Sequence, residues 1–90
     1  MNNTLLTVTF RDPIVRSLAM RAAADHDEGG WTCNTASDDS ANRKYPATIN
    51  CTDTADATKT AADLIRWFEE EYGESLSGHG LEVKYEEEQP

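Results

Sequence analysis

The segment between Asp53 and Gly73 carries apolar residues at intervals of three and four, the spacing of an amphipathic helix. The residues of this stripe are Ala57, Ala61, Leu64, Ile65, Phe68 and Tyr72. Asp53 or Thr54 can cap its start, and Gly73 permits the left-handed backbone that follows a last helical turn. The pattern therefore predicts a long helix that Leu64, Ile65 and Phe68 anchor to the rest of the domain.

A shorter helix is predicted to begin at Asp12-Pro13. The Asp12 side chain can accept a hydrogen bond from a free N–H of the first turn, and proline lacks an N–H at a position where it would be unpaired. The apolar stripe of this helix consists of Ile14, Val15, Leu18, Ala19 and Ala22. We expect the helix to end near His26, with Gly29-Gly30 as its left-handed exit.

Four other segments alternate between apolar and polar residues, which is typical of β-strands. They span residues 4–10, 31–36, 45–51 and 81–85. The second and third segments are expected to pair as a hairpin, joined by a polar and mobile loop from Ser37 to Lys44. Cys33 and Cys51 have matching positions in this hairpin, so we expect both thiols in or near the core as cross-strand neighbours.

The predicted element order is βαββαβ, which indicates an α+β fold of the ferredoxin-like, split β-α-β type. In this fold a four-stranded antiparallel sheet carries both helices on one face, and its other face is open. Ninety residues suffice for one core. We therefore expect a single domain over residues 1–85, followed by an acidic C-terminal tail over residues 86–90.

The net charge of −9 and the pI near 4.4 constrain the binding partners. Such a field repels phosphates and anionic lipids, so direct binding to nucleic acid or to a membrane is not expected. The charge is concentrated in residues 46–90, where eleven acidic residues stand against three basic ones. Neither an export signal nor an apolar run of membrane-spanning length is recognisable, so a cytoplasmic location is expected.

Sequence patterns of catalysis or metal binding are not recognisable. Asp25, His26, Asp27 and Glu28 are the densest group of potential ligands, but consecutive helical residues point in different directions and cannot converge on one ion. His79 is a single loop histidine, and Gly78-His79-Gly80 lacks the remainder of a phosphate-binding loop. We therefore expect a protein that is not an enzyme and has no cofactor or metal.

The acidic residues of the long helix and the last strand are the candidate binding surface. Asp56, Asp63, Glu70 and Glu74 are separated by seven, seven and four residues and are expected to share one outward sector of the helix. Glu69 and Glu71 flank this sector, and Glu82 and Glu86 continue the charge from the last strand. One interpretation is that these acids only keep the protein soluble. The other is that they imitate the charge of a nucleic-acid backbone and dock on a basic groove of another protein.

In size, charge and predicted topology, the whole chain resembles the small acidic inhibitors that phages encode against CRISPR or restriction systems. The resemblance implies a mechanism, the steric and electrostatic occupation of a nucleic-acid-binding site on a partner complex. The leading hypothesis is therefore a non-enzymatic, anti-CRISPR-like inhibitor in the host cytoplasm, monomeric or homodimeric. An alternative is a small regulatory or structural subunit that dimerises or docks through its open sheet face. A third is a small enzyme whose site has no recognisable sequence pattern.

Overall fold

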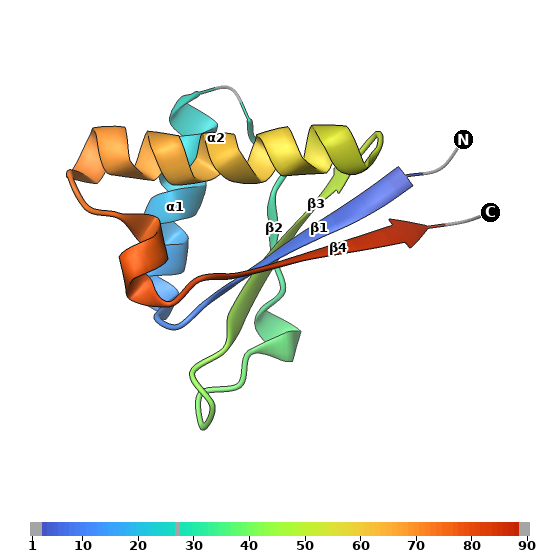
Figure 1. Ribbon diagram of the computed structural model, residues 1–90. Coiled ribbons are helices and arrows are strands. Elements are labelled where there is room, and N and C mark those ends of the chain that lie inside the picture. The colour runs from blue at the N-terminus through green and yellow to red at the C-terminus, as the bar shows by residue number, and fades with distance from the viewer. Residues whose placement is uncertain (1–2, 27, 89–90) are drawn as a thin grey trace.

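The computed structural model describes residues 3–26 and 28–88 and confirms the βαββαβ order. The elements are β1 (Asn3–Phe10), α1 (Pro13–Asp25), β2 (Thr32–Cys33), β3 (Tyr45–Cys51), α2 (Thr54–Tyr72) and β4 (Glu82–Glu88). Two short 3-10 helices lie between them, η1 (Thr35–Ser37) and η2 (Leu76–His79). Figure 1 shows α2 crossing above the strands with α1 behind it.

The four strands form one antiparallel sheet in the order β2-β3-β1-β4, which confirms the expected α+β class. Val8 of β1 lies opposite Ala47 of β3 on one side and Val83 of β4 on the other. β2 is shorter than predicted and pairs with β3 through only two residues. The chain leaves the sheet after Cys33 because it turns into η1, so the sheet departs from a regular ferredoxin-like one at this edge.

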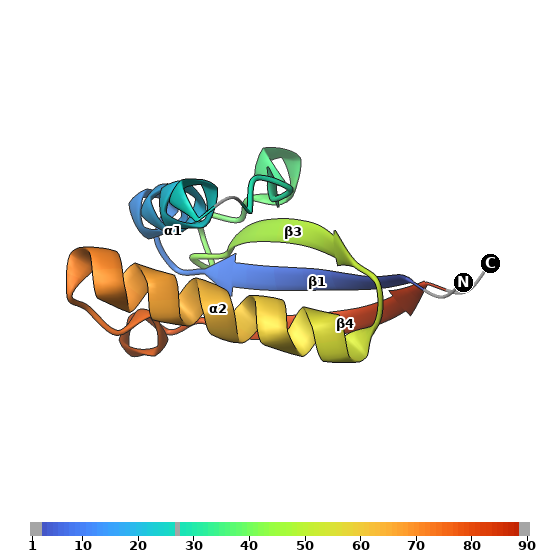
Figure 2. The same ribbon diagram turned by 90° about the horizontal axis from the view of Figure 1, so that it is seen from above.

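The core lies between one face of the sheet and the two helices. Leu6, Val8 and Phe10 alternate along β1 and are buried on this helix-side face. They belong to one buried cluster with residues of both helices, namely Ala19, Ala23, Ala57, Ala61, Leu64 and Phe68. The many alanines allow the helix backbones to approach the sheet closely. Seen from above in Figure 2, α2 runs along β1 and β4, while α1 lies on the β3 side of the sheet. The prediction that Leu64 and Phe68 anchor α2 is confirmed, and Ile65 is partly buried beside them.

The open face of the sheet carries the alternate residues of the same strands. Leu5, Thr7 and Thr9 of β1 and Thr48 of β3 are half-buried there. Cross-strand partners in an antiparallel sheet share a face, so Glu82 opposite Thr9 and Glu86 opposite Leu5 lie on the open face too.

Both helix starts agree with the predicted caps. Asp12 accepts a hydrogen bond of 2.8 Å from the Ile14 N–H, and Asp53 accepts one of 2.7 Å from the Asp56 N–H. Gly73 follows α2 in the left-handed region with φ 68°. The expected glycine exit of α1 is wrong: this helix ends at Asp25, and only Gly73 and Gly80 have positive φ among the described glycines.

The two cysteines are not cross-strand neighbours, so that prediction is wrong. Cys33 lies opposite Ala47 and is exposed, whereas Cys51 lies opposite Thr4 and is buried. The register of the β2–β3 pair explains the difference. Cys33 pairs with Ala47, and Cys51 lies four residues beyond Ala47 on β3, past the part of β3 that pairs with β2. Cys51 is surrounded by core residues, and burial raises the pKa of its thiol.

β4 continues to Glu88, beyond the expected end of the domain at residue 85. Glu86 lies opposite Leu5 and Glu87 opposite Thr4, so these residues of the expected tail are part of the sheet. Residues 89–90, the rest of that tail, lie outside the described residues.

The segment from Ser37 to Lys44, expected as a mobile loop, contains a closed turn. Asp39 and Lys44 exchange two backbone hydrogen bonds of 2.8 and 2.9 Å. The Asp39 carboxylate also accepts hydrogen bonds from the backbone and side-chain amides of Asn42. These two bonds hold the pKa of Asp39 below its ordinary value.

Candidate functional site

Asp56 belongs to the cap of α2 and is half-buried. Its carboxylate accepts hydrogen bonds of 3.1 and 3.3 Å from the N–H and hydroxyl of Thr52, while its own N–H donates to Asp53. A negative charge in the first helical turn also interacts favourably with the free N–H groups there. The structure therefore assigns Asp56 a role in starting the helix.

Asp63 is also turned away from solvent, with a side chain only 14% exposed. Its carboxylate lies 3.0 Å from a guanidinium nitrogen of Arg66 and 3.9 Å from the Lys59 ammonium. The expectation of an outward sector is therefore wrong for Asp56 and Asp63. The seven-residue spacing does keep both on one side of α2, but that side is partly covered, and of the two carboxylates only Asp63 is in ion pairs.

Glu28 faces the same side of α2, although the sequence placed it only in a group of potential ligands after the first helix. It is half-buried, and its pKa is raised above the ordinary value, first by burial and then by repulsion from Asp63 and Asp56. A hydrogen bond with Thr60 partly opposes this rise. In the sequence, residues 25–28 have the composition of a solvated helix end. No local pattern indicates that Glu28 packs beside α2.

Glu71 is exposed and lies beside Asp25 of α1. The neighbouring Asp25 carboxyl group raises the pKa of Glu71, because a hydrogen bond between two carboxyl groups requires one of them to be protonated and because two carboxylates repel each other. Asp27, another member of the predicted ligand group, lies outside the described residues.

The remaining predicted acids are exposed: Glu69, Glu70 and Glu74 at the end of α2, and Glu82 and Glu86 on β4. Glu74 lies 3.5 Å from a ring nitrogen of His79, and Glu86 pairs with Lys84 at 2.7 Å. Glu70 follows Asp63 by seven residues and so occupies the same side of α2. The predicted set does not form one continuous surface.

Some of these acids gather around β4, which is an edge strand of the sheet. Glu82 and Glu86 lie on the open face, whereas the neighbouring Glu87 lies on the helix-side face, where it accepts a hydrogen bond of 3.1 Å from the Thr54 hydroxyl. We call Glu82, Glu86 and Glu87 the acidic edge.

The acidic edge can bind cationic side chains. Within residues 3–26 and 28–88, no three histidine, cysteine or acidic side chains gather as ligands of a metal ion. Carboxylates at an exposed edge can accept charge-assisted hydrogen bonds from arginine and lysine. The backbone of β4 adds a second means of contact, because an edge strand presents unpaired N–H and C=O groups on its outer side.

Comparisons with known proteins identify no relatives: no protein family, curated protein or solved structure matches the chain. Neither of the described helices combines the length and the apolar character needed to cross a membrane.

Proposed function

We propose that this chain is a non-enzymatic protein-binding inhibitor whose acidic edge occupies a basic, nucleic-acid-binding groove of a partner complex. The observation that supports the proposal is the presence of exposed carboxylates on both faces of one edge strand. Glu86 and Glu87 are adjacent in sequence but project to opposite sides of β4. The edge therefore offers negative charge to a groove that encloses it.

A groove that holds a nucleic-acid strand contacts charged phosphates with Arg and Lys from more than one side. A strand with glutamates on both faces can satisfy such a groove in a similar way, and the charge of −9 would speed the encounter. Bound in this way, the protein excludes the nucleic acid sterically and electrostatically. An anti-CRISPR or anti-restriction inhibitor acting in the cytoplasm of a host cell is the form of the proposal that we favour.

The test begins with capture of partners from a bacterial lysate by the full chain at low and high salt. Screening limits the reach of exposed charges to about 8 Å at physiological ionic strength, so the specific partner should be lost at high salt. The captured protein is then tested for binding to its own nucleic acid with and without the chain. Competition supports the proposal, and simultaneous binding of both contradicts it.

A matched pair of variants separates the acidic edge from net charge. Glu82→Gln, Glu86→Gln and Glu87→Gln together raise the net charge by three units at the edge. Thr35→Lys, Ser40→Lys and Ala41→Lys raise it equally at exposed positions between β2 and β3. The proposal requires that the first variant loses the partner and that the second retains it.

The open sheet face favours a second candidate, a regulatory or structural subunit that dimerises or docks through this face. Its support is that Leu5, Thr7, Thr9 and Thr48 are half-buried on a face that neither described helix covers. Thr48→Arg, on β3 and separated from β4 by β1, disrupts this face and keeps all the glutamates of the acidic edge. Loss of partner binding or of dimers in this variant alone would identify the open face as the interface.

A further inference from the structure

A small hollow lies where the chain leaves β1, turns before β3 and enters β4. The hollow is open to solvent, and its enclosed part, about 10 Å³, has room for only one water-sized group. A larger ion would therefore lie across its mouth, against the exposed side chains that line it. The hollow is lined by Thr9, Arg11, Asn42, Arg43, Lys44, Gly80 and Glu82. Distant parts of the sequence thus contribute three cationic residues to one place.

The hollow has the opposite charge to the molecule as a whole. Arg11, Arg43 and Lys44 outweigh the single carboxylate of Glu82, whereas the chain carries −9. Four of the other basic residues are each paired with a carboxylate, namely Arg16, Lys59, Arg66 and Lys84. By contrast, Arg11, Arg43 and Lys44 form no ion pair with any of the residues that the structure describes.

The backbone on both sides of the hollow is shaped to hold these cations. Gly80 has φ 78°, and a Cβ at this position would lie 2.7 Å from Cδ and 2.9 Å from Nε of Arg11. Only glycine therefore allows the Arg11 side chain to lie where it does. On the other side, Arg43 has φ 53°, an uncommon value for a residue with a side chain, within the turn that Asp39 and Lys44 close.

We propose that this hollow binds a small phosphate-type oxyanion, either free phosphate or the phosphoryl group of a small phosphomonoester. Two guanidinium groups and an ammonium are the side chains that proteins use to hold such anions. The Thr9 hydroxyl and the Asn42 amide, which line the same hollow, can add uncharged donors. Glu82 repels the anion and limits its affinity. The site shares Glu82 with the acidic edge, but its cationic side chains are not part of that edge, and anion binding here does not require the partner proposed above.

The test is an NMR titration of the full chain, labelled with ¹⁵N, at constant ionic strength. Inorganic phosphate and glycerol phosphate are the probes, and chloride and acetate are the reference anions. Saturable shifts at the backbone amides of residues 9–11, 42–44 and 80–82 are expected with phosphate, and the probe that saturates first identifies the preferred form. Shifts of equal size with chloride, or none, would overturn the proposal.

Variants test whether the named residues form the site. Arg43→Gly removes a cation and suits the positive φ, so the turn should persist while phosphate binding weakens roughly tenfold, as expected for loss of a charge-assisted contact. Glu82→Gln removes the repelling carboxylate and should tighten binding. Arg21→Gln is the control, because it removes an exposed positive charge of α1 that does not line the hollow. Equal weakening by Arg43→Gly and Arg21→Gln would contradict a local site.

Discussion

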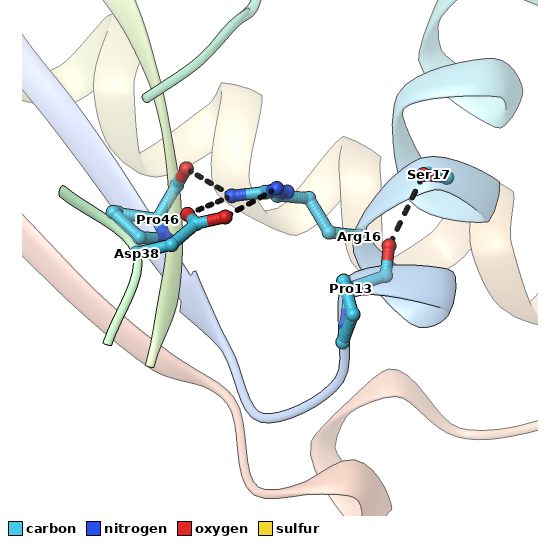
Figure 3. Close-up of polar contacts among 5 residues, drawn as sticks. All are labelled: Pro13, Arg16, Ser17, Asp38 and Pro46. Atoms are coloured by element: carbon cyan, nitrogen blue, oxygen red, sulfur yellow. Dashed lines mark hydrogen bonds and ion pairs between the residues drawn. The ribbon is translucent and has the colours of Figure 1, made fainter. Parts of the chain in front are cut away.

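Arg16 of α1 and Asp38, 22 residues later in the chain, form a bidentate ion pair with nitrogen–oxygen distances of 2.6 and 3.1 Å (Figure 3). The same guanidinium donates a hydrogen bond of 3.2 Å to the carbonyl oxygen of Pro46 and lies over the Tyr45 ring. With its side chain only 7% exposed, Arg16 is among the few buried polar residues. The pair connects α1 to the segment after η1 and to the start of β3.

Asp38→Ala should destabilise the protein because it leaves a buried guanidinium without its counter-charge. We expect a loss of about 2 to 3 kcal/mol in the free energy of unfolding, below the range for a fully buried pair because Asp38 is partly exposed. Urea denaturation measures this change. Glu70→Ala, at an exposed position, should alter stability by about 0.5 kcal/mol or less. A similar small effect of Asp38→Ala would mean that the pair contributes nothing to folding.

Phe68→Ala tests the anchor of α2 in the core. Phe68 is 1% exposed and packs against Tyr72 with ring centroids 5.0 Å apart. Removing a buried ring of this size should lower the free energy of unfolding by about 3 to 5 kcal/mol. Because a loss of this size would leave Phe68→Ala partly unfolded, Phe68→Leu, a less destabilising substitution, is measured as well. Thermal midpoints unchanged in both variants would show that another face of α2 is buried.

The two thiols should react at very different rates. Cys33 is exposed, whereas Cys51 is 5% exposed and its thiol pKa is raised by burial, so it has less of the reactive thiolate. A bulky thiol reagent should modify one cysteine quickly in the native protein and the second only on unfolding. Cys33→Ser should abolish the fast reaction and Cys51→Ser should retain it; fast modification of Cys51 in the native protein is the contrary result.

Glu28 should make stability depend on pH. Its pKa is raised in the folded protein by burial and by repulsion from Asp63 and Asp56. The ionised form therefore opposes folding at neutral pH, and this effect disappears as the pH falls through the raised pKa toward the ordinary glutamate value. Glu28→Gln should have a higher thermal midpoint than the parent at pH 7, with the difference shrinking at acidic pH. A difference that grows on acidification would contradict the assignment.

The elements and their order could be predicted from the sequence because they depend on short-range patterns. The alternation of Leu6, Val8 and Phe10 specifies which side of β1 is apolar. The stripe from Ala57 to Phe68 does the same for α2, and Asp12 and Asp53 mark the helix starts. Each pattern acts within a few residues, so neighbouring residues alone determine it.

Long-range relations needed the tertiary structure. The spacing of Asp56 and Asp63 places them on one side of α2, but only the packing of the chain around Glu28 decides that this side is partly covered. The register of β3 decides that Cys33 faces Ala47, and the turn after η1 brings Asp38 to Arg16. The division of the acids between the two faces of β4 follows in the same way from its pairing with β1. Such contacts join residues far apart in the chain, and their geometry depends on how whole elements pack rather than on any local repeat of residues.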